Sequence, residues 1–471
     1  MQSRRDQVQA YFFVVGRLVA GLMQGRPDVL EHPNKRFNNG TVLGILLAGL
    51  LVAVFGIVGL FAPSGNNSWR ADGTIVMEKE TGARYVYVAG QLRPVLNTTS
   101  AFLAVGQHSK PVAVSRNSLT GVAVGAPIGI PGAPDGLPAT DRLNTGEWTV
   151  CARPPDGSSV ASPPTVTVHL GQPAVHRLAG DKGLVVVTPD KTSYLVWKGS
   201  RYRITEKLVL EALGYDAERM LTVAPAWLNT IRAGADLKAP VIAGVGEPGA
   251  TVSGRPGRVG QLYEVDNPTL SSVQFYVLTG NGLLPVSRTV AAMLVVAPAT
   301  KAAYPGEPVR IIKTGPDVLA SVQLAAGALG TDLPQSPPDV ADVDEGMLLC
   351  MNFSGSPGEG GTLVTVPRSA ETTAVAPAGK TVEGATADHF VIPAGLGALV
   401  TSSPAPGVTG GTEYLITDLG VKFPLANDSV GTSLGYGNVS RRLTSPVLLN
   451  LLPTGPALDP AFAVTERLIS P

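Results

Sequence analysis

The sequence has no excess of either charge and very few histidines. It contains 36 Lys and Arg against 36 Asp and Glu, so its formal net charge is zero. Nucleic-acid binding normally requires a basic surface, and this balance therefore argues against it. The histidines show no HExxH motif or other close ligand spacing, so we expect no metal site. The five histidines are His32, His108, His169, His176 and His389.

Long hydrophobic runs are also scarce, and only one could cross a membrane. Residues 41–62 (TVLGILLAGLLVAVFGIVGLFA) carry no charge, and as a helix they would extend about 33 Å. A cleaved signal sequence is the alternative. Its apolar region is usually about 7–15 residues long and close to the N-terminus, whereas about 40 residues precede this run. We therefore predict a retained transmembrane helix.

Basic residues lie on one side of this run and predict its orientation. The far side is uncharged until Arg70. The positive-inside rule then places the N-terminus in the cytoplasm and exports the C-terminal bulk. We expect a single-pass protein of the plasma (inner) membrane with an exported, periplasmic region. The basic residues before the run are Arg4, Arg5, Arg17, Arg26, Lys35 and Arg36.

Residues 1–24 contain apolar side chains at three- and four-residue steps, which predicts a helix with an apolar face. Arg17 interrupts it, so it is unsuited to spanning a membrane, and Pro27 and Pro33 end it. Such a helix either lies on the inner leaflet or docks on a cytoplasmic partner. The apolar positions are Val8, Tyr11, Phe12, Val15, Leu18, Val19 and Leu22.

Beyond the apolar run, four segments share one pattern. Each has an aromatic residue, a short apolar run, a glycine, a second apolar residue and then Thr, Ser or Asn, which predicts a hairpin, an N-cap and a short helix. The 55 Gly and 40 Pro also favour short strands over long helices. The segments start at Tyr85 (YVYVAGQLRPVLN), Tyr194 (YLVWKGSRYRITE), Phe275 (FYVLTGNGLLPVS) and Tyr414 (YLITDLGVKFPLAND), with turns at Gly90, Gly199, Gly282 and Gly420.

The four repeats form a duplicated pair. An offset of about 191 residues aligns the first with the third, and an offset of 221 aligns the second with the fourth over about 35 residues. We number them repeats 1 to 4 in chain order. The second offset matches Gly199 with Gly420, Tyr215 with Tyr436, Pro225 with Pro446, Asn229 with Asn450 and Gly234 with Gly455.

The only two cysteines occupy equivalent places in the duplication. Cys151 lies between repeats 1 and 2 and Cys350 between repeats 3 and 4, both in strand-like surroundings (WTVCA and MLLCM). Outside the cell such a pair favours a disulfide over two free thiols. We predict that the inter-repeat segments meet at a pseudo-two-fold axis as a central β-domain that the disulfide joins. The alternative is a disulfide that links unrelated loops.

The whole chain resembles the EccB family of the actinobacterial type VII (ESX) secretion machinery. The segments SRRDQVQAYFFVVGRLVAGLM, HPNKRFNNGTVLGILLAGLLVAVFGIVGLF and YVYVAGQLRPVLN and the two cysteines carry the resemblance. It implies a structural subunit that assembles with an EccC-type motor ATPase, EccD, EccE and other EccB copies in a hexameric membrane complex. It also implies contact with a mycosin protease.

Some members of this family are labelled ATPases, and an ATPase of this kind would carry a phosphate loop. Residues 374–381 (AVAPAGKT) fit a relaxed pattern that ends in Gly379, Lys380 and Thr381, with alanine in place of the first glycine. A working loop opens a helix, but the following TVEGATADHF is a poor helix start, and ATP is scarce outside the cell. We interpret the segment as a solvated turn and expect no cofactor.

Another motif imitates an enzyme site. Residues 431–435 (GTSLG) match a nucleophile elbow, but the equivalent part of repeat 2 has no serine. Asp and Glu are scattered without a facing pair, so we identify no catalytic residue. A scaffolding subunit is the favoured function. The alternatives are a membrane-anchored nucleotide hydrolase and a cell-wall-binding ectodomain.

The predicted fold class is a membrane-anchored chain with a single transmembrane helix and an exported α+β, β-rich domain of four hairpin-helix repeats. The expected divisions are a cytoplasmic helix and arm (1–40), the transmembrane helix (41–62), a linker (63–84), repeat 1 (85–110), a central segment with Cys151 (111–193), repeat 2 (194–240), a connector (241–272), repeat 3 (273–300), a central segment with Cys350 (301–412), and repeat 4 with the C-terminal tail (413–471).

Overall fold

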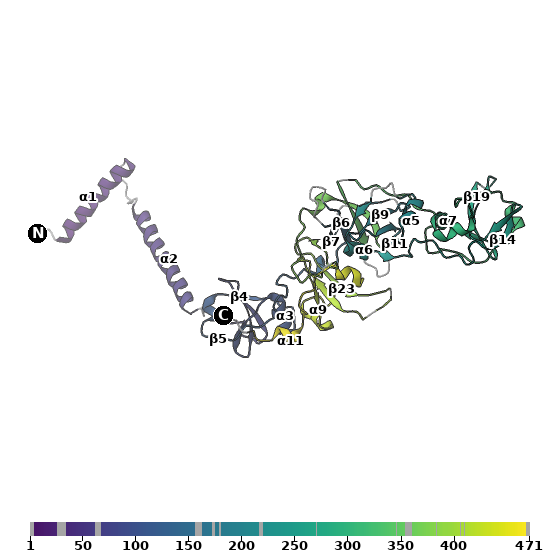
Figure 1. The fold of residues 1–471 in the computed structure, drawn as a ribbon. Helices are drawn as coiled ribbons and strands as arrows, with labels where there is room; N and C mark the ends of the chain where they lie inside the picture. Colours follow the sequence, from purple (N-terminus) through teal and green to yellow (C-terminus); the bar gives the residue numbers. More distant parts are fainter. Residues whose placement is uncertain are drawn as a thin grey trace.

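Two helices lie outside a long, β-rich region that we call the body (residues 67–467) (Figure 1). They are α1 (Arg4–Gln24) and α2 (Asn34–Phe61). The structure is a computed structural model. It describes residues 4–25, 34–61, 67–155, 163–171, 175–178, 180–215, 220–269, 271–344, 346–353, 360–382, 384–405, 407–408 and 410–467.

Helix α2 contains the predicted membrane-spanning segment. Its stretch Phe37–Ile57 has 21 residues and a mean hydropathy of 2.5, and none of its most apolar window is buried against the protein. Apolar side chains that the protein does not cover are what a helix in lipid presents. The predicted run 41–62 lies inside α2 except for Ala62, which falls outside the described residues, as do Pro27 and Pro33.

The predicted hairpins are present in all four repeats, each within a small sheet of the same order. A first strand pairs with the hairpin, a short helix follows, and a fourth strand returns parallel to the first. Repeat 1 has β1 (Thr74–Glu78), β2 (Arg84–Val88), β3 (Gln91–Pro94), α3 (Thr98–Val105), β4 (Val112–Val114), α4 (Arg116–Leu119) and β5 (Ala123–Val124). Repeat 2 has β9 (Leu184–Val187), β10 (Ser193–Trp197), β11 (Ser200–Ile204), α5 (Lys207–Ala212), β12 (Leu221–Thr222), α6 (Pro225–Asn229) and β13 (Arg232–Ala233).

The other two repeats have the same plan. Repeat 3 has β16 (Leu262–Asn267), β17 (Ser272–Thr279), β18 (Gly282–Val286), α7 (Arg288–Val296), β19 (Ile311–Thr314) and α8 (Val318–Ser321). Repeat 4 has β23 (Ala398–Ser402), β24 (Glu413–Ile416), β25 (Lys422–Pro424), α9 (Asp428–Ser433), β26 (Arg442–Thr444) and α10 (Pro446–Asn450). Smaller elements are η1 (Thr140–Arg142), β14 (Pro248–Val252), β15 (Arg255–Arg258), η2 (Pro298–Ala303), η3 (Arg368–Glu371) and α11 (Pro460–Ala463).

Local chemistry explains why the repeated pattern folds in this way. In repeat 2, Lys198 and Gly199 both have positive φ (47° and 71°), which is the backbone of a tight turn that matches the twist of two antiparallel strands. The helix that follows is capped by a side chain in three repeats. Asn97 accepts a hydrogen bond from Ser100 N, Ser287 from Val290 N and Asn427 from Ser429 N. In repeat 2 the N-cap is Glu206, whose side chain makes no such bond.

The sheet of each repeat extends beyond the residue range that we predicted for that repeat from the sequence. In repeat 1, β1 lies in the region expected to be a linker, and β4 and β5 lie in the region assigned to the central segment. These strands have two to five residues, which is too short for a periodic apolar pattern to separate them from loops. The sequence therefore showed the hairpin and helix of each repeat and left its outer strands unassigned.

A six-stranded sheet lies between the repeats and follows a two-fold arrangement. Its order is β22-β7-β6-β20-β21-β8, and at its middle β6 and β20 run antiparallel with Cys151 directly opposite Cys350. The duplication relates β6 to β20 and β7 to β21, so the pseudo-two-fold axis passes through the cysteine pair. The strands are β6 (Trp148–Arg153), β7 (Thr165–Leu170), β8 (His176–Arg177), β20 (Met347–Phe353), β21 (Thr362–Pro367) and β22 (His389–Val391).

The repeats pack in pairs that cross the duplication. One hydrophobic cluster joins repeat 1 with repeat 4 through Phe102 of α3 and Leu434 after α9. A second joins repeat 2 with repeat 3 through Leu210 of α5 and Met293 of α7. We call these pairs the proximal lobe (repeats 1 and 4) and the distal lobe (repeats 2 and 3). Along the body, the proximal lobe follows α2, the central sheet comes next, and the distal lobe forms the far end (Figure 1).

Candidate functional site

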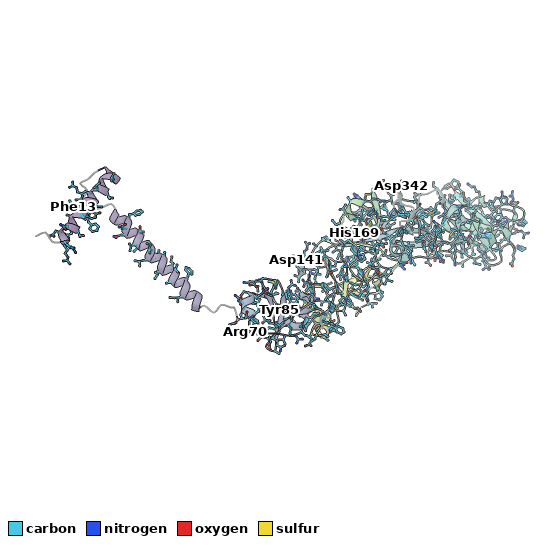
Figure 2. All side chains as sticks on the ribbon, turned by 60° about the vertical axis from the view of Figure 1, so that its left-hand side comes forward. Phe13, Arg70, Tyr85, Asp141, His169 and Asp342 are labelled. Atoms are coloured by element: carbon cyan, nitrogen blue, oxygen red, sulfur yellow. A yellow bond between two sulfur atoms is a disulfide. The ribbon has the colours of Figure 1, made fainter. Side chains whose placement is uncertain are left out.

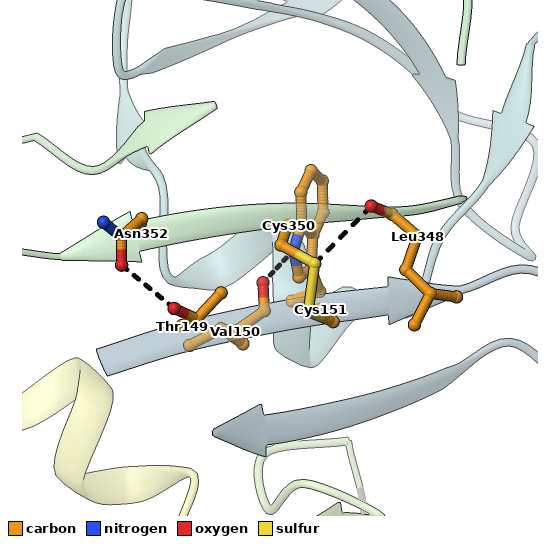
Figure 3. Close-up of a disulfide and its surroundings, with 7 residues drawn as sticks. Thr149, Val150, Cys151, Leu348, Cys350 and Asn352 are labelled. Atoms are coloured by element: carbon orange, nitrogen blue, oxygen red, sulfur yellow. Dashed lines mark hydrogen bonds between the residues drawn. A yellow bond between two sulfur atoms is a disulfide. The ribbon is translucent and has the colours of Figure 1, made fainter. Parts of the chain in front are cut away.

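The junction at the axis is where the chain holds its two lobes together. Cys151 and Cys350 form a disulfide, both are fully buried, and they pack against Leu348, Val364 and Val366. Figure 3 shows the bond between the two central strands. The disulfide that the sequence predicted is therefore present, and it closes 199 residues of chain.

Polar side chains continue the link on the disulfide face of the sheet. Thr149 Oγ1 donates a hydrogen bond to Asn352 Oδ1 over 2.9 Å (Figure 3), and Asn352 Nδ2 donates to the Glu147 carboxylate. Thr149 is fully buried and Asn352 is 7 % exposed. Because a buried polar group is costly unless it is paired, these hydrogen bonds favour a single register of β6 against β20.

Two tyrosines attach the repeats to the central region in equivalent ways. Tyr215, at the end of the repeat 2 helix, donates from its hydroxyl to Pro338 O (3.1 Å), and Tyr436 in repeat 4 donates to Pro138 O (2.7 Å). Both are buried, and burial raises the pKa of each hydroxyl. The two tyrosines are the matched pair in the 221-residue offset, so these bonds follow the duplication.

We expect Tyr215→Phe and Tyr436→Phe each to lower the free energy of unfolding of the body by about 1–2 kcal/mol, because each leaves a proline carbonyl without its donor. The two losses should add in the double variant, because the two tyrosines make separate bonds. Urea titration of the purified chain in detergent measures the three values. A cost for one tyrosine and none for the other would contradict the functional equivalence of the two contacts.

A buried lysine stabilises the end of α10 in repeat 4. Lys422 is 6 % exposed, and its Nζ donates hydrogen bonds to Leu449 O and, over 2.8 Å, to Leu452 O. A cation near the C-terminus of a helix satisfies carbonyls that have no partner within the helix. Burial lowers the pKa of Lys422 to about 8. The equivalent residue in repeat 2 is Arg201, which donates to Asn229 Oδ1 instead.

This lysine gives the stability of repeat 4 a pH dependence. Its folded pKa of about 8 lies below the ordinary value of 10.5, so between these values the unfolded chain binds more protons and stability rises with pH. We expect the wild type to gain up to about 3 kcal/mol over Lys422→Met between pH 8 and pH 10.5. Urea unfolding of both proteins across this range measures the difference, and a difference that does not change with pH would contradict it. The neutral amine keeps two N–H donors for the two carbonyls.

The two motifs that resemble enzyme sites, around Lys380 and Ser433, make contacts within the fold. Lys380 forms an isolated bridge with Thr454, and the described residues after it, Thr381 and Val382, are not helical. A phosphate loop needs a helix N-terminus at that point. Ser433 lies at the end of α9 and is buried, and its hydroxyl donates to Gly106 O and Ser429 O.

The histidines that the structure describes do not come together with other side chains as a metal site. His169 lies inside the body (Figure 2), is 2 % exposed, and has a pKa that burial lowers to about 4. Among the described residues no three His, Cys, Asp or Glu side chains gather as a metal site would require. His32 lies outside those residues. The buried polar side chains described above, such as Lys422 and Ser433, make hydrogen bonds within the fold.

Helix α1 carries large apolar side chains that no described residue covers. Tyr11, Phe12 and Leu22 are 67 %, 66 % and 80 % exposed, and Phe13 and Val14 are also exposed. Figure 2 shows Phe13 on the helix, away from the body. The apolar surface is therefore wider than the face that the sequence predicted. Exposed patches of this kind mark contacts with a membrane or another protein.

These features define a class of protein: a chain with one membrane-length helix whose β-rich body is a cross-linked duplication of repeats. The chain belongs to the family described as Type VII secretion system ESX-1, transport TM domain B, whose model matches residues 1–470. The resemblance stated from the sequence is thus confirmed.

Relatives and solved structures agree with this assignment. The chain is 28% identical to the ESX-3 secretion system ATPase EccB3 of Mycolicibacterium smegmatis, over 98% of this chain and 90% of the relative. It is 31% identical to the ESX-2 secretion system ATPase EccB2 of Mycobacterium tuberculosis, over 67% and 62% respectively. Its fold matches a chain of an intact ESX-5 inner membrane complex with a TM-score of 0.67 and 23% identity, over 100% of this chain and 97% of that one. It also matches the EccB3 dimer of the ESX-3 core complex, with a TM-score of 0.66 and 24% identity over 83% and 100%.

Sequence reasoning missed Lys422 and the packing of the lobes. The segment Lys422–Pro424 is a three-residue strand after a glycine turn, and nothing in its local pattern distinguishes a buried lysine from the exposed lysines that are usual in turns. The 221-residue offset was the available signal. It aligns Lys422 with Arg201, so both repeats place a cation at this position.

Proposed function

We propose that this chain is a structural subunit of a type VII secretion complex that connects components across the membrane. The single observation that carries the proposal is a cross-linked body joined through a membrane-length helix to an apolar helix with uncovered side chains. Each of these parts can bind another protein or the bilayer, and none of the described residues forms a catalytic set. The names of its relatives place those proteins in ESX secretion systems.

We further propose that α1 lies in the cytoplasm and the body lies outside. Arg4, Arg5 and Arg17 precede the spanning helix, whereas the first basic residue after it is Arg70. This asymmetry supports the orientation by the positive-inside rule. An oxidising exterior also suits the buried disulfide. Protease added to cells whose wall has been removed should digest the body and spare α1, and the reverse result would overturn the orientation.

The partners that we propose are other copies of this chain, an EccC-type motor ATPase, EccD, EccE and a mycosin protease. Complexes named for the ESX-5 inner membrane and for an EccB3 dimer contain chains of this fold, which supports assembly with other components. The cytoplasmic partners would contact α1, since its exposed Tyr11, Phe12 and Leu22 are the side chains of the described N-terminal region best suited to an interface.

Removal of residues 1–24 tests this assignment. We expect the shortened chain to insert in the membrane and keep its thermal stability, but to lose co-purification with the motor ATPase. A Phe12→Ser, Phe13→Ser variant should weaken the same association, and Arg5→Gln is the matched control on the same helix. Full co-purification of the shortened chain would contradict a docking role for α1.

Nucleotide hydrolysis is tested on the same preparations, because the names of the relatives include the word ATPase. We expect Lys380→Ala to leave assembly and any measured hydrolysis unchanged, since Lys380 lies in a bridge with Thr454 and no helix opens after it in the described residues. Hydrolysis by the purified chain that disappears in Lys380→Ala would instead favour an intrinsic nucleotide hydrolase.

A further inference from the structure

In both repeats of the proximal lobe, an extended segment of the chain pairs with the outer edge of the sheet, at Ile128 in repeat 1 and at Thr454 in repeat 4. In repeat 1 this contact lies beyond the end of β5, and Val124 of β5 itself stays exposed. In repeat 1, Glu466 of the C-terminal segment pairs antiparallel with Ile128. Arg467 N donates to Pro127 O (2.8 Å), and Arg93 Nη2 contacts the Glu466 carboxylate at 2.6 Å. In repeat 4, Lys380 pairs antiparallel with Thr454. The chain thus adds an extended segment of its own to the edge of each sheet.

The matching edge in repeat 2 has no such segment among the described residues. The 221-residue offset places Ala233 of β13 where repeat 4 has Thr454. The segment that covers repeat 4 belongs to residues 368–388, which connect β21 to β22. The equivalent connection in the first half, between β7 and β8, consists of residues 171–175. It is too short to reach across the repeat, because extended chain spans at most about 3.5 Å per residue.

Among the described residues, the backbone donor and acceptor of Ala233 on the uncovered edge have no partner. Gly234 N donates to Arg201 O over 2.8 Å, and Arg201 is the residue opposite Ala233 in the parallel pair. In a parallel ladder, the two residues on either side of Ala233 make the hydrogen bonds to β11. The N–H and C=O of Ala233 therefore point away from β11. Ala233 is exposed. Such an edge is a template for another strand.

A groove with basic side chains runs along this edge. Its volume is about 310 Å³, and it is lined by β13, by the start of β21 near Gly361 and by Val447 of α10. Arg201 and Arg232 contribute two guanidinium groups, and the lining residues that the structure describes include no carboxylate. Arg201 is half-buried and donates to the neutral Asn229 Oδ1 (2.8 Å). In repeat 1 the covering segment supplies the carboxylate of Glu466 to Arg93 of β3. Arg93 aligns with Tyr202, one position after Arg201, so this contact shows an acidic segment binding an arginine of the same strand and not of the same position.

We propose that the outer edge of β13 binds an extended, carboxylate-bearing segment of a partner protein by antiparallel strand addition. The backbone of Ala233 would pair with the added strand, and Arg201 and Arg232 would hold its acidic side chain. The inference deepens the proposed function and rests on it, because the partner is another component of the secretion complex. It names the distal lobe as a docking surface separate from α1.

Binding of short peptides to the full-length chain in detergent tests the proposal. The probes are three labelled eight-residue peptides of alternating Thr and Val that carry a central Glu, Gln or Lys, and fluorescence anisotropy gives their affinities. We expect the Glu peptide to bind roughly tenfold more tightly than the Lys peptide. Arg201→Gln and Ala233→Pro should each weaken it by roughly tenfold, since one removes the charge and the other the outward N–H donor.

Two control variants show whether the edge itself binds the peptide. Ala233→Ser keeps the backbone donor, and Arg255→Gln removes an exposed arginine of β15 outside the groove, so both should bind the Glu peptide as the wild type does. Unchanged thermal unfolding of each variant confirms that it is folded. No saturable binding, equal binding of the three peptides, or binding that survives Ala233→Pro would overturn the proposal.

Two other occupants of the edge would give their own results. Self-association of the wild type that Ala233→Pro abolishes, without peptide binding, would assign the edge to a second copy. Peptide binding that appears only in Glu359→Gln would assign it to the chain's own residues 354–359, which lie outside the described residues. Either result overturns the proposal. Neither affects the co-purification test of the proposed function, which depends on α1.

Discussion

Replacing Cys151 by serine is expected to lower the free energy of unfolding of the body by about 3–5 kcal/mol. The bond closes 199 residues of chain, and a loop of that length restricts the unfolded state by about 5 kcal/mol in the chain-entropy view. The substitution also places a hydroxyl among buried apolar side chains, including Leu348 and Val364, where it has a cost of its own. Urea unfolding of the purified chain without reductant measures the loss.

Three comparisons test whether the broken disulfide is the cause of this loss of stability. Cys350→Ser should cost as much as Cys151→Ser, and the double variant should cost only the second buried hydroxyl more than either, because all three break one bond. Reductant should destabilise only the wild type. We expect co-purified motor activity to persist, since the bond lies inside the body. Two free thiols in the native protein on non-reducing electrophoresis would contradict the pairing.

The parts of the fold that follow from local chemistry could be predicted from the sequence. An uncharged apolar run predicted α2, a glycine between apolar segments predicted each hairpin, and equivalent positions in a duplication predicted the cysteine pair. Each depends on residues that are adjacent in the chain or related by a constant offset. Gly199 is an example, because its positive φ of 71° is a property of one turn.

The packing of the lobes could not be predicted in that way. Neighbours in the chain usually pack together, and repeat 2 does pack on repeat 3, but repeat 1 packs on repeat 4 at the other end of the body's sequence. The choice depends on which helix faces are buried, such as those of Phe102 and Met293, and all four helices are too short, at six to nine residues, for their sequences to show which partner each face meets. The uncovered edge at Ala233 also could not be predicted from the sequence, because β13 has only two residues and such a short strand shows no periodicity.

Replacing Trp227 by alanine is the other change with a large expected effect. Trp227 belongs to α6 of repeat 2 and is fully buried in the cluster that joins this repeat to the central sheet. Its Nε1 donates a hydrogen bond to Val150 O over 3.0 Å. Val150 is the residue before Cys151 of the disulfide (Figure 3). Removing a buried tryptophan leaves a large cavity, so we expect a loss of about 3–5 kcal/mol.

Two further variants separate packing from hydrogen bonding at this contact. Trp227→Phe keeps most of the apolar volume and loses the donor, so it should cost about 1–2 kcal/mol. Leu448 takes the equivalent place in repeat 4 and is 3 % exposed, and Leu448→Ala should cost about 2–4 kcal/mol because a smaller side chain is removed. Hydrogen exchange should show that Trp227→Ala loosens the distal lobe and that Leu448→Ala loosens the proximal lobe. If both variants loosened the same lobe, the central sheet would not hold the two lobes through separate, equivalent contacts.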